Sequence, residues 1–538
     1  MPEFADAALW WVVLKALAVG VLLLLLGGLV LRVMRVPAAR AARYMAPATA
    51  ERWFLQLALG LSGVGWCAVL LAELGRFTLG WLLGLLVAAC VGLRLMCGPA
   101  GLRDPSRGGG STDILAMGAL CLLAVCLYVP PYQTALWASD STAYLNFGRQ
   151  ISETGGFVFE DRFLASLEPD TRRALFLNTT LSDVTGTYAR FPGGFLIPDI
   201  ADPRVTAGFS PLFPALLALF HLLFGLEGAL LIGPIFATLS VCGLYLLGAR
   251  LSGPSTGMLA ATLLAVSASQ AWFAKFPLPA VVSQFFVIAG LVALLVSLAH
   301  GGRRLACGAG WLLGVAVLGK FDLVAVLPVT ALTVLVGAGL TRAVPGVVSR
   351  WSVGMCALVG LALPLLHTTA HFVAFPSHYA PFLARMLQMS RLWTLMVPLA
   401  GVGLLAGLLT LLVSRGPGRA WLSDPQRRQR VAATLGLTLL VAYAVGYVNA
   451  SENRLAETTA WLGWYLSWPV LGLAMIGVGS ALRAWWKGRS NIGLLVMVAL
   501  LAAGTICTTR TRPQISSGRY GDLSPSSYLP CCWWRLSW

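Results

Sequence analysis

Apolar runs long enough to cross a lipid bilayer recur along almost the whole chain, and they restrict its fold more than any other feature. A transmembrane helix needs about 20 consecutive apolar residues, and the first such run covers residues 8–31. Only 11% of the 538 residues are charged and the mean hydropathy is +0.80, whereas a soluble domain usually carries about a quarter charged residues. The sequence therefore predicts an all-α, polytopic membrane protein.

The basic residues between the runs indicate how the helices are oriented. Acidic Glu3 and Asp6 precede the first run, and five arginines follow it: Arg32, Arg35, Arg40, Arg43 and Arg52. Because lysines and arginines concentrate in cytoplasmic loops, the loop after the first run is expected in the cytoplasm and the N-terminus outside the cell. The same alternation predicts a bundle of about 14 spans in the inner (plasma) membrane, with both termini outside. The net charge of +17 then reflects this orientation and does not indicate nucleic-acid binding.

One apolar run is too short for this pattern. Pro211–Phe224 falls below the roughly 18–20 residues of a span, so it is expected to be an interfacial or re-entrant helix. If it lies flat, the next span, residues 228–249, places Arg250 in the cytoplasm. If it crosses, Arg250 and every later basic loop lie outside, against the charge rule.

The longest polar segment lies between residues 132 and 210, and it is expected to be a large outer loop with interfacial helices. Nine of the 21 acidic residues lie in or beside it: Asp140, Glu153, Glu160, Asp161, Glu168, Asp170, Asp183, Asp199 and Asp202. Ser141 to Glu153 predicts a short amphipathic helix, with Tyr144, Phe147 and Ile151 on one face. We divide the chain into a three-helix membrane extension (1–112), a transmembrane catalytic domain (113–507) and an irregular tail (508–538).

The two ends of the chain need separate interpretation. The first run has no basic flank before it and no small-residue cleavage site after it, so it is expected to be a retained span. Ser517–Trp538 is polar, then rich in Cys and Trp, and fits no element. A one-base shift of the reading frame, with permitted codons, would give an Arg-Arg-bearing loop and a further span. The hypothesis is a frameshift, which would make this chain a truncated and inactive version of a longer protein.

Polar side chains expected near the outer membrane face form the candidate site. One carboxylate among several cations suits a substrate with a phosphate head and an apolar tail, so Asp140 is the candidate general base for an acceptor hydroxyl. The candidate ligands of the donor phosphate are Lys275, Lys320, Arg385 and Arg391. Further candidate substrate-binding residues are Tyr144, Asp322, His371, His378 and Arg454.

These residues also have structural interpretations. Asp140 can cap a helix or form a salt bridge, and the two lysines can extend along apolar surface to reach the interface. Lys320 can pair with Asp322, the histidines can be structural, and the arginines can cap an interfacial helix. No His/Asp cluster has the spacing of a metal site, so neither a divalent metal nor another cofactor is indicated.

Several segments carry a family resemblance through their order. Asp140-Ser-Thr-Ala-Tyr144 is followed by Gly155-Gly156, and Pro211-Leu-Phe-Pro214 leads to Leu223-Phe-Gly225. Gly319-Lys320-Phe-Asp322 follows later. From about Asp113 onward the chain resembles the C-superfamily (GT-C) glycosyltransferases. More narrowly, it is similar to the bacterial family 39-type branch of protein mannosyltransferases and the lipid A aminoarabinose transferase.

The resemblance implies an inverting glycosyltransferase of the cell envelope, with Asp140 as the catalytic base. The donor would be a polyprenyl-phosphate-linked sugar, and the acceptor would be a lipid, a glycan or a protein outside the membrane. Two departures weaken a metal-dependent mechanism: the turn Lys275-Phe-Pro-Leu-Pro-Ala280 has no acidic residue, and Ser141 rather than a second acid follows Asp140.

A multi-pass transporter or flippase of a lipid-linked or small polar substrate is the alternative from another class. It predicts ionisable residues at mid-membrane depth and an inverted repeat. Lys15 is the clearest such residue, and no repeat is visible between the two halves. The charges are expected to gather on one side of the membrane, which favours an enzyme over a transporter. A third interpretation, a nonenzymatic membrane scaffold, leaves the acidic loop unexplained.

Overall fold

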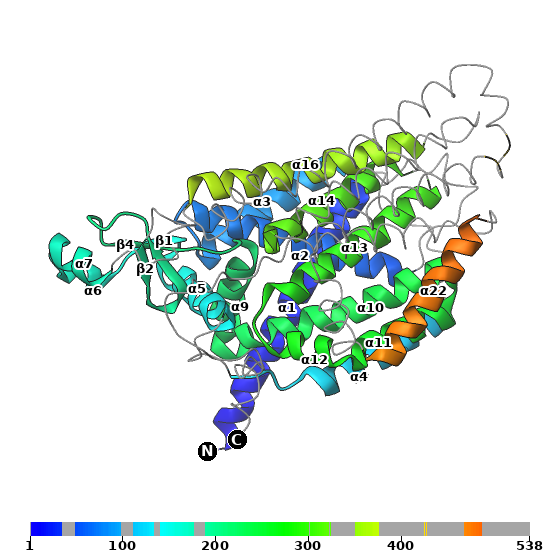
Figure 1. Ribbon diagram of the computed structural model, residues 1–538, viewed down its shortest axis with the longest axis horizontal. Helices are drawn as coiled ribbons and strands as arrows, with labels where there is room; N and C mark the ends of the chain where they lie inside the picture. The colour runs from blue at the N-terminus through cyan, green and yellow to red at the C-terminus, as the bar shows by residue number, and fades with distance from the viewer. Residues whose placement is uncertain are drawn as a thin grey trace, which may run out of the picture.

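The computed structural model describes residues 2–34, 49–97, 111–133, 140–176, 189–300, 302–321, 350–375 and 467–486, together with Leu323, Asp424 and Arg427. These residues are mostly helical (Figure 1), and the structure confirms a membrane protein in this coarse sense. Among the described residues, six helices have the length and apolar composition to cross a bilayer. They are α1 (Pro2–Val33, apolar from Leu14), α2 (Thr49–Glu73), α9 (Leu212–Leu230), α10 (Ile232–Ser252), α13 (Pro279–His300) and α16 (Arg350–Ala374).

Further helices complete the described part of the bundle. α11 (Pro254–Val266) and α12 (Ala268–Lys275) meet at a 60° bend and together can form a seventh span. The remaining helices of the bundle are α3 (Leu79–Cys97), α4 (Ser111–Tyr128) and α14 (Arg303–Gly319), and α22 (Trp468–Trp486) is a further described helix. The other predicted spans after residue 320 lie outside the described residues.

One end of the bundle, which we call the loop end, is defined by the contacts of its helix termini. A Cβ placed on Gly319 would lie 2.7 Å from Ser283 Oγ, which brings the end of α14 to the start of α13. A Cβ on Gly233 would lie 2.3 Å from the carbonyl oxygen of Ala274, so α10 starts beside the end of α12. The amide of Phe157 donates to the carbonyl of Ala72 at the end of α2 (3.2 Å).

The opposite, basic end collects arginines at helix termini: Arg32, Arg94, Arg250, Arg303 and Arg304. Arg250 forms two 2.7 Å hydrogen bonds with the carboxylate of Glu51, which is 7% exposed. Arg304 Nη1 donates to the carbonyl of Val33 (3.2 Å), and Tyr245 donates to Asp113 Oδ1 (2.6 Å). The arginines named here therefore lie at the end of the bundle opposite the polar loop.

Glycines allow neighbouring helices to approach closely in the middle of the bundle. A Cβ on Gly310 would lie 1.8 Å from the carbonyl oxygen of Ala357, and one on Gly360 would lie 1.9 Å from that of Cys307. α14 and α16 therefore touch backbone to backbone, as small residues permit in membrane bundles. Among the described residues, one buried core cluster contains side chains from α1 to α16.

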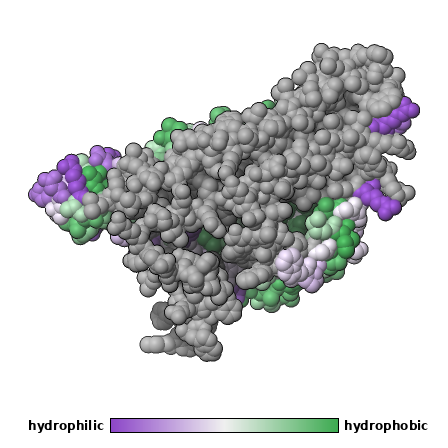
Figure 2. Space-filling view, in the orientation of Figure 1, coloured by the Kyte–Doolittle hydropathy of each residue, from purple (hydrophilic) through white to green (hydrophobic). Residues whose placement is uncertain are grey.

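The polar loop contains the predicted amphipathic helix and an unpredicted sheet. α5 (Asp140–Thr154) buries Tyr144, Phe147 and Ile151, as the sequence indicates. The loop continues with β1 (Val158–Glu160), α6 (Arg162–Ser166), α7 (Pro169–Leu175), β2 (Ala189–Phe191), η3 (Pro192–Gly194), β3 (Phe195–Ile197) and β4 (Arg204–Ala207). The strands pair antiparallel in the order β1-β4-β3-β2. Hydrophilic surface gathers where α6 and α7 lie (left in Figure 2), and mostly apolar surface lies where α22 runs.

α9 is longer than the predicted run, and a break at Gly225 divides it into two parts. Gly225 (φ 70°, ψ −164°) interrupts the helix directly after Phe224. At its start, Leu212 lies against Gly319. At the interruption, the carbonyl of Leu223 accepts a 3.3 Å hydrogen bond from Lys15 Nζ. The length and composition of α9 allow a span, so the re-entrant helix stays a prediction.

α16 corrects the expected position of two histidines. The sequence predicts a helix over 351–366 with His367 and His371 in the following loop, but the helix continues to Ala374. The hydroxyls of Thr368 and Thr369 donate to carbonyls one turn earlier (2.8 and 2.9 Å), so these polar residues stay within the helix. The apolar run marks where hydropathy changes and not where the helix ends.

Gly310→Ala tests the close contact between α14 and α16. The added methyl group would overlap the Ala357 carbonyl, so we expect destabilisation of roughly 1–3 kcal/mol, measured as a lower thermal unfolding temperature in detergent. Gly84→Ala in α3 is the control, because a Cβ there meets nothing within 4 Å. It should be neutral or stabilising by up to about 1 kcal/mol. Equal effects of the two variants would contradict this packing.

Candidate functional site

Asp140 is the first residue of α5, and its side chain is exposed. α5 lies against α9 at the loop end, where a Cβ on Gly148 would lie 2.4 Å from Leu217 Cβ. The N-terminus of a helix favours a negative charge, because its backbone N–H groups point toward it. Asp140 is thus an accessible carboxylate on a firmly packed helix.

Most other described carboxylates of the loop have structural partners. Asp161 accepts two 3.0 Å hydrogen bonds from the first amides of α6. Asp202 is held by Arg204, whose side-chain hydrogen bond keeps the pKa of that carboxyl below its ordinary value. Glu153 and Asp170 form ion pairs with neighbouring arginines. Within the described residues Asp140 forms no hydrogen bond or ion pair, which distinguishes it from these four.

Tyr144 lies one turn after Asp140 and is 3% exposed. Its ring stacks on Phe209 (centroids 4.8 Å apart) and meets Phe213 edge-on (5.3 Å). The sequence predicts a candidate substrate-binding residue here. In the structure, the ring fixes the start of α5 to the segment that enters α9.

Lys320 follows α14 directly and is half-buried. The next amide, of Phe321, donates to Ser210 Oγ (3.2 Å), and Ser210 adjoins the Phe209 that stacks on Tyr144. Through these contacts Lys320 lies in the same part of the loop end as the start of α5.

Lys275 ends α12 and is attached to the segment that precedes Asp140. Its carbonyl accepts a 3.0 Å hydrogen bond from the amide of Tyr132. Its Nζ lies 5.4 Å from the centroid of the Tyr132 ring, a cation–π geometry. Both predicted phosphate-binding lysines therefore lie at the loop end, together with Asp140. The other predicted site residues lie outside the described residues: Asp322, His378, Arg385, Arg391 and Arg454.

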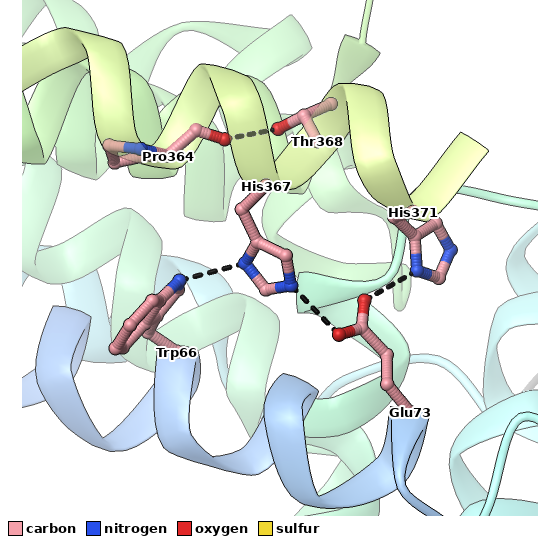
Figure 3. A network of polar contacts seen from close by, with 6 residues as sticks. All are labelled: Trp66, Glu73, Pro364, His367, Thr368 and His371. Carbon is pink, nitrogen blue, oxygen red and sulfur yellow. Dashed lines mark hydrogen bonds and ion pairs between the residues drawn. The ribbon is translucent and has the colours of Figure 1, made fainter. Parts of the chain in front are cut away.

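The structure also contains a polar cluster that sequence reasoning missed (Figure 3). Glu73, at the end of α2, forms hydrogen bonds with His367 Nε2 (2.8 Å) and His371 Nδ1 (2.7 Å) on α16. Trp66 Nε1 donates to His367 Nδ1 (2.8 Å). His371, a candidate substrate-binding residue, is 2% exposed and packs in this cluster. The available signal was the spacing of His367 and His371, one turn apart on an apolar helix.

The described fold and site define a helical membrane protein whose polar loop gathers at one end of the bundle. Comparison of the chain with protein-family models, curated proteins and solved structures finds no match. In the described part of the chain, no group of three or more His, Cys, Asp or Glu residues is arranged to hold a metal ion. The case for a function therefore depends on the site residues themselves.

Tyr144→Ala tests whether this ring fixes α5. Loss of a fully packed aromatic ring should destabilise the loop end by about 3 kcal/mol, and limited proteolysis should cut the loop faster. The control is Phe163→Ala in α6, because the Phe163 side chain is 55% exposed. If both variants resist the protease like the unchanged protein, the ring does not hold α5 in place.

Proposed function

We propose that the protein is an integral-membrane glycosyltransferase that uses a polyprenyl-phosphate-linked sugar at the extracytoplasmic face. The observation that carries the proposal is the position of Asp140. It is an exposed carboxylate without a partner among the described residues, on a helix packed at the loop end. Lys275 and Lys320 lie at the same end.

The proposed reaction is a single displacement at the anomeric carbon of the sugar. Asp140 accepts the proton of the acceptor hydroxyl as that oxygen forms a bond to the anomeric carbon. The bond between this carbon and the phosphate oxygen breaks, and the polyprenyl phosphate leaves with the electron pair. Lys275 and Lys320 would stabilise the negative charge on the leaving phosphate. A single displacement inverts the anomeric configuration.

The charge distribution supports the proposed sidedness. The basic end carries Arg32, Arg94, Arg250, Arg303 and Arg304, and arginine-rich loops remain in the cytoplasm. The loop end then faces away from the cytoplasm. The prenyl chain of the donor would lie along the apolar helices, and a lipid, glycan or protein acceptor would approach from the polar loop.

Asp140→Asn tests the proposal directly. The amide cannot accept the proton, so we expect sugar transfer to fall by about 10²–10⁴-fold while the protein remains folded. The measurement is mass spectrometry of cell-envelope glycans from cells that carry the unchanged gene, the variant or no copy. Asp170→Asn is the control, because Asp170 forms only an exposed ion pair with Arg173, and it should leave transfer unchanged.

Two outcomes would count against the proposal. Full transfer by the Asp140→Asn variant would remove the general base from the mechanism. If the gene leaves glycan structures unchanged but the purified protein moves a fluorescent prenyl-phosphate sugar across vesicles, the protein is a flippase.

A further inference from the structure

The cluster of Trp66, Glu73, His367 and His371 joins α2 to α16 inside the bundle (Figure 3). The side chains of Glu73, His367 and His371 are 15%, 10% and 1% exposed. A charged group so far removed from water requires a partner. The donor and acceptor roles within the cluster follow from the chemistry of its four members.

Trp66 fixes the protonation state of His367. An indole N–H can only donate, so His367 Nδ1, at 2.8 Å, must accept and carries no proton. The proton of the neutral ring is then on Nε2, which donates to Glu73 Oε2. A second proton on this ring would place an N–H against the N–H of Trp66. His367 is therefore held in one neutral form.

His371 has no such restriction. An ionised carboxylate only accepts hydrogen bonds, so His371 Nδ1 donates to Glu73 Oε1 at 2.7 Å. Within the described residues, its Nε2 atom has no hydrogen-bond partner. Aromatic rings surround the imidazole, with Phe375 stacked at 4.9 Å and Phe157 edge-on at 5.2 Å.

The charged groups that act on His371 are few. Glu73 approaches from α2, and His367 lies on the same helix. Among the described residues, the ring neighbours of His371 are uncharged: Phe157 from the loop, Phe372 on α16 and Phe375 directly after it. With both imidazoles neutral, the cluster carries the single negative charge of Glu73. One added proton makes the buried cluster neutral overall.

We propose that this cluster is a proton-binding site, in which one proton from water binds to Nε2 of His371 and forms an imidazolium–carboxylate pair with Glu73. The same geometry disfavours a metal site. Coordination through His367 Nε2 would require a proton on Nδ1, toward which the Trp66 N–H already points. The site binds a single proton because Trp66 prevents His367 from accepting a second one.

The proposed proton site lies where α2, α16 and the polar loop meet. The ion pair draws α16 toward the end of α2, where Ala72 holds the loop through the Phe157 amide. Phe372, next to His371, packs edge-on against Phe321 (4.9 Å), which follows Lys320. Proton binding therefore strengthens the attachment of the loop beside the candidate site, and the inference stands whether or not the protein transfers sugar.

Nitrogen NMR of the full chain in lipid nanodiscs, with ¹⁵N-labelled histidine rings, tests this assignment. Between about pH 9 and pH 4, His371 should lose its unprotonated ring nitrogen, whereas His367 should keep one unprotonated nitrogen throughout. His367→Gln and His371→Gln assign the two sets of signals. If His367 becomes doubly protonated and His371 does not, or if neither changes, the proposal is wrong.

Trp66→Phe tests whether the indole N–H of Trp66, and not the packing of its ring, restricts the protonation of His367. Without its N–H, His367 should also become doubly protonated on acidification. Trp311→Phe is the matched control, because Trp311 packs on Trp66 but donates to Ser62 Oγ (3.1 Å). It should leave His367 unchanged. An unchanged His367 in the Trp66→Phe variant would contradict the proposed restriction.

Discussion

The free-energy cost of a charge in hydrocarbon organises this molecule. On insertion scales, a charged side chain at the centre of a membrane helix costs about 3 kcal/mol, so charges collect at helix ends or pair with each other. At the basic end, Arg250 pairs with Glu51. Near the loop end, the carboxylate of Glu73 forms hydrogen bonds with two histidines, and Lys15 donates to the Leu223 carbonyl beside the interruption of α9. The charged residues at the helix termini therefore distinguish the two ends of the bundle, and the polar loop lies at the end opposite the arginines.

Close helix packing then supports that end. Gly148 lets α5 lie directly against Leu217 of the interrupted helix α9, whose residues from Leu212 to Leu219 are buried. Asp140 begins α5, so its position depends on this packing and on the buried strand β3, whose Phe195 ring meets that of Phe147 (centroids 4.7 Å apart). The proposed transfer reaction would benefit from such support, because small displacements of a catalytic group reduce rates strongly.

How far the sequence predicts this arrangement depends on how local the signal is. Apolar length predicted α1 and α10, and the spacing of Tyr144, Phe147 and Ile151 predicted α5. The charge rule indicated that α9 does not cross, although its composition would allow it. The strands escaped prediction because three or four residues are too few to show alternation. The Glu73 cluster escaped because Trp66 and His367 are far apart in the chain, and only tertiary packing brings them together.

Sidedness is the central claim, and thiol labelling of intact cells measures it most directly. Asp140→Cys and Lys275→Cys represent the loop end, and Arg303→Cys and Arg304→Cys represent the basic end. With a membrane-impermeant maleimide, and the chain's own eleven cysteines as background, the first pair should react in intact cells. The second pair should react only after the membrane is permeabilised. Labelling of the arginine positions in intact cells, with the Asp140 and Lys275 positions protected, would contradict the account.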